Sequence, residues 1–257
     1  MSRSSDVTIF GATGFTGQRV AAEALRSLPP ELRITIAGRS SSKLQALAQQ
    51  LGAADRLQVL GGVDVTKPES LQAMAQATRL LLCCVGPFRL YGEPVLAAAA
   101  AARTDYLDIC GEPEFIERME LRYSAAAAAS GALMASAAGF DSVPADMGCL
   151  FAQRAFAPPA VPSSVEAVIS LSAPKGTSIH YATWWVHCRV SLGDPGYLFT
   201  SVMLVQCAAT LLQERQALLD SVGARGGVFT VGTLFRGSSL LQRLDEHGVK
   251  FSVVGSS

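Results

Sequence analysis

Apolar and polar residues follow two different spacings along the first half of the chain. Short apolar runs, typical of buried strands, alternate with longer stretches whose apolar residues recur every three or four positions, typical of amphipathic helices. The predicted strands are Val7–Phe10, Arg33–Ala37, Leu57–Leu60, Leu80–Val85, Tyr106–Ile109 and Ala132–Ala135. The predicted helices are Phe15–Leu28, Ser42–Leu51, a helix capped by Thr66 and Glu69 that ends at Ala77, Glu93–Ala102 and Pro113–Ala129. This alternation predicts an α/β fold with a doubly wound parallel sheet.

The pattern changes after Phe156. Ala157–Ser164 has the composition of a linker, and mixed strand-like and helical pieces follow it. These pieces are Val165–Leu171, Leu198–Ala217, Val228–Phe235, Ser239–Glu246 and Val249–Val254. We therefore divide the chain into a first domain, residues 1–156, and a small α+β region, residues 157–257. The second region is small for an independent domain, so we expect it to form an added layer on the first.

A glycine-rich turn follows the first predicted strand, in the stretch VTIFGATGFTGQRV. Gly11, Gly14 and Gly17 have the spacing GxxGxxG, a relative of the GxGxxG fingerprint, and they open a predicted helix. The glycines permit a tight turn, close approach of a pyrophosphate, and packing of the helix on the strand. We predict a Rossmann-type dinucleotide site here; the alternative is a glycine turn without a ligand. The other candidate residues of this turn are Thr13, Phe15 and Thr16.

The end of the second predicted strand indicates which dinucleotide is bound. An NAD site places an acidic residue there for the ribose 2′-hydroxyl. This chain has AGRSSSKL instead, with Arg39 at that position, Ser40 beside it and Lys43 close by. Because cations and hydroxyls suit a 2′-phosphate, we predict NADP(H); the alternative is that Arg39 is only a solvated charge. Asp64, just past the third strand, is either an adenine contact or a turn residue.

The stretch CCVGPFRLYGEP leaves the fourth predicted strand. Dinucleotides bind at the carboxyl ends of such strands. We therefore expect Gly86 and Pro87 to let the backbone pass close to the ribose and nicotinamide. Cys83 and Cys84 lie inside the predicted strand, where we expect small core residues rather than nucleophiles.

Composition excludes several classes of function. Lys plus Arg equals Asp plus Glu at 21 each, so the chain has no electrostatic footprint for nucleic acid. The six cysteines are scattered without CxxC spacing, and no histidine lies near a cysteine pair, so we expect no metal site and reduced thiols. The segment MSRSSDV runs directly into a strand, which leaves no room for a signal peptide. We expect an intracellular protein, either cytoplasmic or peripheral to a membrane.

One segment, Pro195–Gln213, approaches the length of a membrane span. It contains proline, glycine and glutamine, so we favour a packed helix, or a helix lying on a membrane surface, over a transmembrane helix.

Several motifs together resemble one known family. They are GATGFTG, AGRS, CVGPFRLYGEPV, TDYLDICGEPEFIERM and GFDSVPADMG. The set is similar to the saccharopine dehydrogenase-like oxidoreductases, which include the trans-acting enoyl reductases of mycobacterial lipid synthesis and a eukaryotic branch on lipid droplets and membranes. The similarity runs from Ser5 to Trp184 and resumes at DPGYLFTSVMLVQ and at GGVFTVGTLFRGSSLLQRLDEHGVKFSVV.

The chain departs from this family in its second half. Family members are considerably longer, and KGTSIHYATW normally leads into a large second domain, whereas here SLGDPGYLF follows almost at once. The resemblance therefore implies an intact cofactor half and a shortened region for substrate binding or oligomerisation. Apolar surface exposed by the shortening would favour a homo-oligomer.

The resemblance implies hydride transfer between NADPH and a carbon–carbon double bond conjugated to a carbonyl, with the protein supplying position and a proton. Tyr91 is the preferred proton donor, because a phenol beside the nicotinamide can protonate an enolate. Asp141 is the second catalytic candidate; the alternative is that it caps a helix. Glu112 is either a catalytic group or a charge that stabilises the first turn of a helix. Cys110 and Ser142 lie on the same loops.

Three functions remain open at this stage. The first is an NADP(H)-dependent oxidoreductase acting on a small-molecule or lipid-linked substrate, possible only if the shortened half still forms a pocket. The second is a non-catalytic dinucleotide-binding protein associated with membranes or lipid droplets. The third, a saccharopine-type amino-acid dehydrogenase, needs clustered cations for a dicarboxylate, and the second half has only widely spaced ones. Among them are Lys175, Arg189, Arg215, Arg225 and Arg236.

Overall fold

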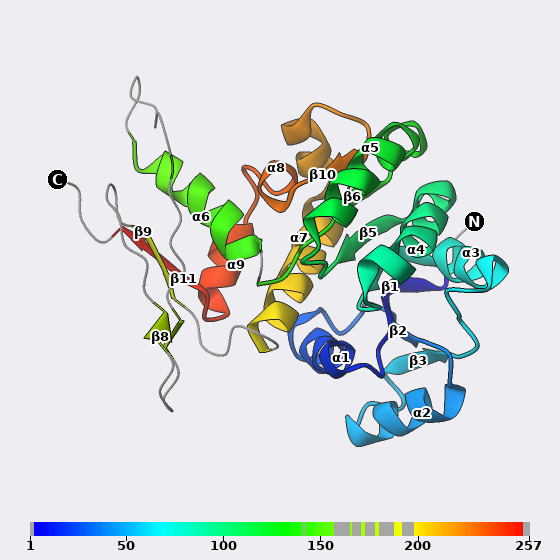
Figure 1. The fold of residues 1–257 in the computed structure, drawn as a ribbon. Helices are drawn as coiled ribbons and strands as arrows, with labels where there is room; N and C mark the ends of the chain where they lie inside the picture. Colours follow the sequence, from blue (N-terminus) through cyan, green and yellow to red (C-terminus); the bar gives the residue numbers. More distant parts are fainter. Residues whose placement is uncertain are drawn as a thin grey trace.

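A parallel β-sheet forms the centre of the computed structural model, which describes residues 3–140, 142–156, 165, 171–172, 178–179, 188–191 and 198–253. Its strands are β1 (Ser5–Phe10), β2 (Ile34–Ala37), β3 (Leu57–Leu60), β4 (Thr78–Cys83), β5 (Asp105–Asp108), β6 (Leu133–Ala135) and β10 (Gly227–Phe229). They are ordered β10-β6-β5-β4-β1-β2-β3, with every neighbouring pair parallel (Figure 1). The predicted doubly wound sheet is confirmed, in the strand order of a Rossmann fold.

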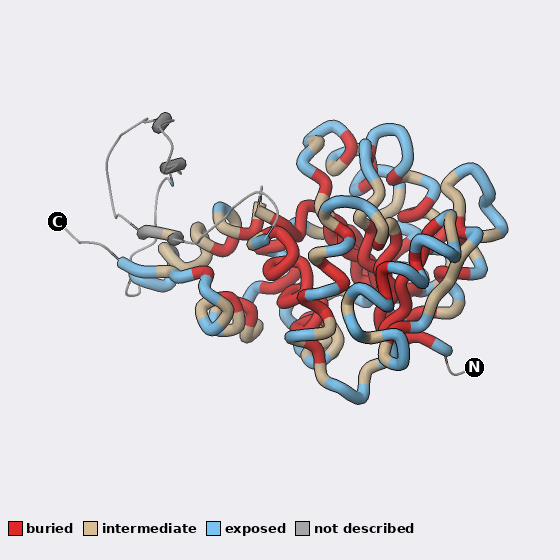
Figure 2. Tube along the Cα trace, turned by 90° about the horizontal axis from the view of Figure 1, so that it is seen from below, coloured by how far each residue is buried: buried red, intermediate tan, exposed pale blue. Residues whose placement is uncertain are grey.

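Helices cover both faces of this sheet. They are α1 (Phe15–Ser27), α2 (Ser41–Gln50), α3 (Pro68–Ala77), α4 (Phe88–Ala102), α5 (Pro113–Ser130) and α7 (Leu198–Val222). Successive strand residues point to opposite faces, so Ile9 packs in the core beneath α1, α2 and α7, while Phe10 packs in the core beneath α3, α4 and α5. Figure 2 shows the buried residues concentrated in the sheet and the helices against it. Strands covered on both faces explain the continuous apolar runs of the sequence.

The long helix α7 is a core element. Every residue from Thr200 to Leu211 is buried, and α7 lies alongside α1. The interpretation of this segment as a packed helix is therefore confirmed. Within the described ranges, none of the helices has the length and apolar content needed to cross a bilayer.

The region after Phe156 contributes directly to the first sheet. The sequence predicts one strand over Val228–Phe235, whereas the structure has the short edge strand β10 followed by helix α8 (Val231–Leu234). The strand ends because the Thr230 side chain caps α8, accepting a hydrogen bond from Thr233 N at 3.2 Å. The added layer thus extends the sheet at β6 and covers one face through α7.

Smaller elements complete the described fold. Helix α6 (Val143–Arg154) packs against β9 (Cys188–Ser191), which pairs antiparallel with β11 (Lys250–Val253). Helix α9 (Leu240–Glu246) lies beside α7, and β7 (Leu171–Ser172) pairs with β8 (Ser178–Ile179). The predicted strand Val165–Leu171 falls largely outside the described residues.

Two predicted helix starts are wrong. Helix α3 begins at Pro68 with Lys67 as its N-cap, and no side chain caps it, because the Thr66 hydroxyl donates to Asp64 Oδ1 at 2.8 Å instead. Helix α4 begins at Phe88 rather than Glu93 and contains Pro94 in its second turn. This earlier start places Tyr91 on a helix rather than in a loop.

A buried ion pair at the start of β1 leads to a pH-dependent prediction. Asp6 is 7% exposed and accepts hydrogen bonds from Arg33 N and Nε, both at 3.0 Å, and from Arg79 Nη1 at 3.2 Å. The hydrogen bonds from the Arg33 side chain are the main reason why the pKa of Asp6 falls to about 2. Because the folded pKa is below the unfolded value, the ionised carboxylate stabilises the fold above about pH 4, and this stability is lost as the pH falls towards 2.

We expect Asp6→Asn to lower the free energy of unfolding at pH 7 by about 1 to 2 kcal/mol, allowing for solvent screening at the exposed ends of the two arginines. The difference from the native chain should shrink as the pH falls from about 5 to about 2. Urea unfolding across this range measures it, with the exposed Asp55→Asn as control. A difference that is constant with pH would contradict the assignment.

Candidate functional site

The glycine turn after β1 has a strong steric reason for two of its glycines, Gly11 and Gly17. Gly11 has φ +84°, and a Cβ there would lie 2.7 Å from Val85 Cγ2 at the end of β4. Gly14 donates its N–H to Gly11 O at 2.9 Å and is the N-cap of α1. A Cβ on Gly17 would lie 2.2 Å from Gly11 O. The helix therefore sits directly on the turn, in the arrangement that the spacing predicts.

This turn opens at the topological switch point of the sheet. β1 lies between β2 and β4, and the helices that follow β1 and β4 cover opposite faces. The first turn of α1 has no acidic residue, and Gly14 provides no side-chain cap for its amides. The free backbone amides and the positive end of the helix dipole at the start of α1 favour the binding of a phosphate. The residues present thus fit the pyrophosphate of a dinucleotide.

Three further predicted residues line the same turn. Thr13 and Thr16 are half-buried, and Phe15 is 59% exposed. The Arg19 guanidinium lies over the Phe15 ring, 3.9 Å from its centre. The turn therefore places hydroxyls, an aromatic ring and a cation around the helix start.

Gly17→Ala is expected to destabilise the fold and weaken nucleotide binding together. The methyl group would overlap the Gly11 carbonyl, so α1 must move away from β1. Overpacking of this kind costs about 1 to 3 kcal/mol of stability. We expect the affinity for NADPH, measured by fluorescence titration, to fall roughly tenfold or more. A loss of about 1.4 kcal/mol in binding free energy already corresponds to a factor of ten. Gly52→Ala, at a turn where a Cβ meets no atom, is the control for backbone strain alone.

The end of β2 carries the predicted cations at the surface. Arg39 and Lys43 are exposed, on either side of the start of α2. The Ser40 hydroxyl caps this helix, accepting from Lys43 N at 3.3 Å, and lies 3.1 Å from Ser42 Oγ. Two cations beside a helix start form a suitable environment for a 2′-phosphate.

Asp64 closes a local turn. Its Oδ1 accepts hydrogen bonds from Thr66 N at 2.9 Å and Thr66 Oγ1 at 2.8 Å. These bonds lower the pKa of Asp64, and the charge of Arg39 contributes to the same shift. The structure thus shows the turn role of Asp64, and the adenine contact stays a prediction.

The loop after β4 is held by a residue of another loop. Gly86 and Pro87 are joined by a cis peptide bond and lead into α4. Both carboxylate oxygens of Glu112 accept hydrogen bonds from the first amides of α4, from Phe88 N at 2.8 Å and Arg89 N at 3.1 Å. Glu112 is itself the N-cap residue of α5, yet its side chain serves the neighbouring helix. The carboxylate therefore positions the loop that carries Gly86 and Pro87.

Glu112→Gln tests this positioning role. An amide can accept from only one of the two N–H groups, so the start of α4 loses a charge-assisted bond. We expect a loss of about 1 to 2 kcal/mol in the free energy of unfolding and a several-fold weaker affinity for NADPH. Glu114→Gln, on the exposed first turn of α5, is the matched control. Equal effects of the two substitutions would show that only the negative charge of α5 matters.

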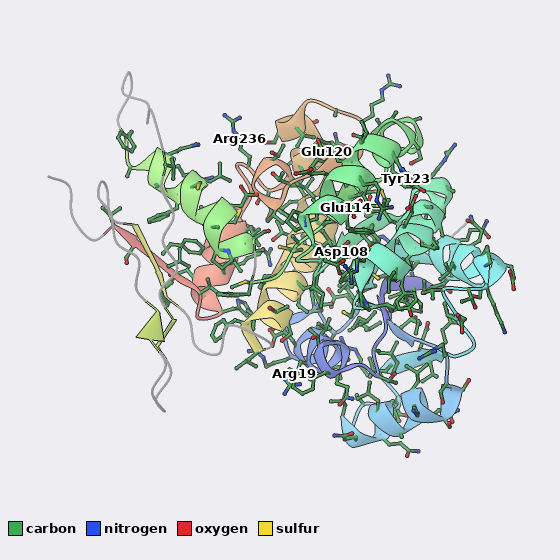
Figure 3. All side chains as sticks on the ribbon, viewed as in Figure 1. Arg19, Asp108, Glu114, Glu120, Tyr123 and Arg236 are labelled. Carbon is green, nitrogen blue, oxygen red and sulfur yellow. The ribbon has the colours of Figure 1, made fainter. Side chains whose placement is uncertain are left out.

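Sequence reasoning missed Asp108, at the carboxyl end of β5 (Figure 3). It is fully buried, and its carboxylate accepts from Tyr106 Oη at 2.9 Å, Ser136 Oγ at 3.0 Å and Cys110 N at 2.9 Å. It also accepts from the amide of Ala137, which has φ +59°. Burial raises its pKa. The sequence did contain a signal for this residue. An acidic side chain, Asp108, directly follows the apolar Tyr106 and Leu107 near the end of a predicted buried strand.

The cysteines near this cluster are protonated at neutral pH. Burial raises the pKa of both Cys83 and Cys110 to about 12, and it raises that of Cys84 well above its ordinary value. Cys83 is a buried residue of β4, as predicted. Cys110 Sγ accepts a hydrogen bond from Glu112 N at 3.3 Å. None of the three thiols is an activated nucleophile.

The two predicted catalytic residues differ in what the structure shows of them. Tyr91 lies in the first turn of α4, is 39% exposed, and has no hydrogen-bond partner for its hydroxyl within the described part of the chain. Asp141 lies outside the described residues. Ser142 is the N-cap of α6 but makes no capping bond with its side chain. Tyr91 is thus the candidate that the structure places beside the loop of Gly86 and Pro87.

The sheet order, the glycine turn and the basic end of β2 together define a Rossmann-type NADP-binding domain. Residues 7–134 match the family model of the saccharopine dehydrogenase NADP binding domain. A rat saccharopine dehydrogenase-like oxidoreductase is 40% identical over 208 residues, which cover 76% of this chain and 48% of that protein. An Arabidopsis thaliana protein described as a mitochondrial saccharopine dehydrogenase-like oxidoreductase is 41% identical over 187 residues, 70% of this chain and 41% of its own. The chain belongs to the saccharopine dehydrogenase-like oxidoreductase family.

Other similarities are more limited. A Mycobacterium tuberculosis protein described as a trans-acting enoyl reductase is 41% identical over 145 residues, 56% of this chain and 34% of that protein. Among solved structures, saccharopine dehydrogenase (L-Glu forming) from Saccharomyces cerevisiae has a TM-score of 0.44 at 18% identity, covering 59% of this chain and 30% of that one. The chain spans less than half the length of the relatives it matches.

Proposed function

We propose that the protein is an NADP(H)-dependent oxidoreductase that reduces a carbon–carbon double bond conjugated to a carbonyl, in a small-molecule or lipid-linked acyl substrate. The observation that carries this proposal is the glycine turn at the switch point with Arg39 at the end of β2. The similarity to a trans-acting enoyl reductase supports the choice of substrate class.

Each residue of the site has a part in this reaction. The start of α1 and Arg39 bind the phosphates, and Glu112 holds the loop of Gly86 and Pro87 beside the nicotinamide ribose. When bound, NADPH supplies the hydride that the β-carbon of the substrate accepts. The electron pair of the double bond then forms an enolate, and the Tyr91 hydroxyl protonates its α-carbon.

Exposed apolar side chains near the crevice support an acyl substrate. Leu90 is 61% exposed and lies beside Tyr91 in the first turn of α4, and Phe15 is 59% exposed at the start of α1. Both turns begin at the carboxyl edge of the sheet, where the dinucleotide binds. An acyl chain would cover such side chains and remove them from water.

The test is substrate-dependent oxidation of NADPH by the full chain. We first titrate NADPH, NADH and NADP⁺ by protein fluorescence. We then follow NADPH absorbance, which should fall when NADPH is supplied with short-chain or long-chain 2-enoyl thioesters and, in a separate assay, should rise if saccharopine is oxidised with NADP⁺ as the hydride acceptor. Turnover of an enoyl thioester supports the proposal. Turnover of saccharopine alone would assign the chain to amino-acid oxidation.

Exposed apolar side chains near the crevice favour one second candidate, a dinucleotide-binding protein without catalysis that associates with a membrane or lipid-droplet surface or with a second copy of itself. Leu90 is 61% exposed and Phe15 is 59% exposed. NADPH binding without turnover, together with flotation on phospholipid vesicles or a dimer in sedimentation, would support this candidate over the first.

A further inference from the structure

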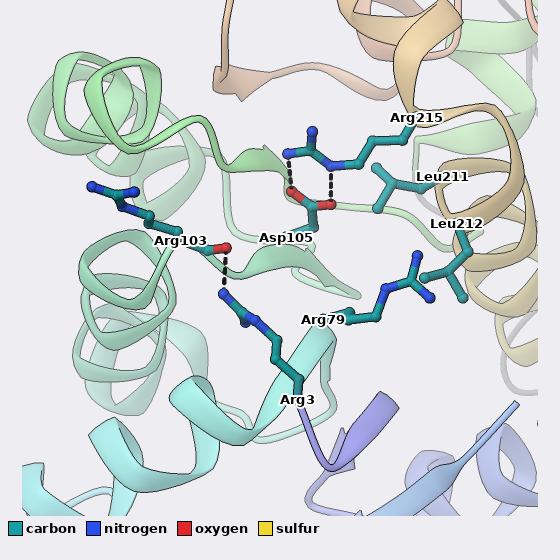
Figure 4. Close-up of a pocket in the computed structure, with 7 residues that line it drawn as sticks. All are labelled: Arg3, Arg79, Arg103, Asp105, Leu211, Leu212 and Arg215. Atoms are coloured by element: carbon teal, nitrogen blue, oxygen red, sulfur yellow. Dashed lines mark hydrogen bonds and ion pairs between the residues drawn. The ribbon is translucent and has the colours of Figure 1, made fainter. Parts of the chain in front are cut away.

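A second hollow lies at the amino-terminal edge of the sheet, opposite the edge that carries the glycine turn. It has a volume of about 150 Å³ and is formed by the segment before β1, the starts of β4 and β5, and the middle of α7 (Figure 4). Its lining residues are Arg3, Arg79, Arg103, Asp105, Leu211, Leu212 and Arg215. The proposed function uses none of them.

The only carboxylate in the lining is already neutralised. Asp105 is 5% exposed and binds Arg215 through two bonds, Nε to Oδ2 at 2.7 Å and Nη2 to Oδ1 at 3.0 Å. Its Oδ1 also accepts from Leu133 N at 2.8 Å. The hydrogen-bonding capacity of Asp105 is therefore largely used, and its single charge is shared between Arg215 and Arg3.

Arg3 directs its donors to neutral acceptors. Its Nη2 donates to the carbonyls of Ala102 and Arg103, both at 2.8 Å, at the end of α4. Its Nη1 donates to Thr78 O, Thr104 Oγ1 and Ala75 O, so both terminal nitrogens are engaged. Burial lowers the pKa of Arg3, the charge of Asp105 raises it, and the charges of Arg215 and Arg79 lower it further, which shows that the three cations repel one another.

Arg79 is the most available cation of the hollow. Among the described residues its guanidinium binds Asp6 alone, through Nη1 at 3.2 Å, and Asp6 is already bound by Arg33 through two bonds. Its side chain is 48% exposed. Figure 4 shows Arg79 extending toward Leu212, while the Arg103 guanidinium points away from Asp105.

We propose that this hollow is a binding site for a phosphate-sized oxyanion, inorganic phosphate or a phosphate monoester, bound by Arg79 in the positive field of Arg3 and Arg215. Planar guanidinium groups bind phosphate oxygens through paired hydrogen bonds. The volume suits one phosphate group and is well below that of a nucleotide pocket. Leu211 and Leu212 form an apolar wall on the α7 side, and the site is separate from that of the dinucleotide.

Calorimetric titration with inorganic phosphate tests the proposal, at constant ionic strength maintained with chloride and with NADPH present to fill the dinucleotide site. We expect the native chain to bind phosphate and Arg79→Gln to bind it at least tenfold more weakly. Arg79→Lys keeps the charge and should retain intermediate affinity. Arg236→Gln, at an exposed arginine that does not line the hollow, should behave like the native chain.

The outcomes separate the alternatives. Phosphate binding that Arg79→Gln leaves unchanged, or that chloride reproduces, would overturn the proposal. Phosphate binding that NADPH abolishes would place the anion at the dinucleotide site and overturn the proposal too.

A second experiment distinguishes the sources of the phosphate group by flotation of the protein on phosphatidylcholine vesicles with and without phosphatidic acid. Capture by phosphatidic acid that Arg79→Gln abolishes supports the same site with a lipid phosphate as its source, and binding of free phosphate alone supports a soluble source.

Discussion

Arg39→Asp is expected to weaken NADPH binding by about 100-fold or more while leaving NADH binding within a few-fold of the native value. The substitution removes a charge-assisted bond to the 2′-phosphate, worth about 1.5 to 3 kcal/mol, and adds a repelling carboxylate. Each 1.4 kcal/mol is a factor of ten in affinity. NADH has no 2′-phosphate, and an acid at the end of β2 can accept a hydrogen bond from its ribose hydroxyl.

Fluorescence titration with both nucleotides measures this change in preference. Arg39 is exposed and no structural hydrogen bond of its side chain is found among the described residues, so the variant should fold normally. Arg236→Asp makes the same charge change at a distant exposed position and should affect neither nucleotide. If Arg39→Asp weakened NADPH and NADH equally, Arg39 would not be the residue that selects the 2′-phosphate.

Tyr91→Phe is expected to lower kcat for reduction of an enoyl substrate by roughly 100-fold or more and to leave the Kd for NADPH within about twofold. A positioned general acid contributes 10²- to 10⁴-fold to a rate, and phenylalanine keeps the ring while it removes the proton. This prediction rests on the proposed function. The native hydroxyl has no internal partner in the described structure, so its loss should not change stability.

Stopped-flow absorbance of NADPH, with a parallel nucleotide titration, separates catalysis from binding. Tyr123→Phe is the matched control, because its hydroxyl donates to Glu93 Oε1 at 3.1 Å between α4 and α5. That variant should lose a little stability and keep its kcat. If Tyr91→Phe kept the native kcat and the native affinity for NADPH, another side chain or solvent would have to donate the proton.

The first half of the fold was predictable because its signals are local. The central residues of the covered strands are mostly apolar, and glycines stand where the turn after β1 leaves no room for a side chain at Gly11 and Gly17. The errors also have local causes. Helix α4 was predicted to start at Glu93, although it begins at Phe88 and contains Pro94, and Thr66 was assigned to a helix cap although its hydroxyl binds Asp64. Neither error could be detected without knowing which partner each group meets.

The second half was less predictable because its contacts are distant in sequence. Gly227–Phe229 is short, and only its pairing with Leu133–Ala135 makes it an edge strand of the main sheet. The apolar content of Leu198–Leu211 fitted either a membrane segment or a core helix. Its burial against α1 and the sheet decided between them.

The sequence alone determined the class of fold, the position of the dinucleotide turn and the preference for a 2′-phosphate, because spacing and charge at single positions decide these properties. Tertiary structure alone decided the partners of the charged groups. It assigned Glu112 to the neighbouring helix α4, buried Asp108 among four donors, and gathered arginines from distant segments around Asp105. Such pairings depend on which strand ends become neighbours in the sheet, and no local pattern of residues encodes that arrangement.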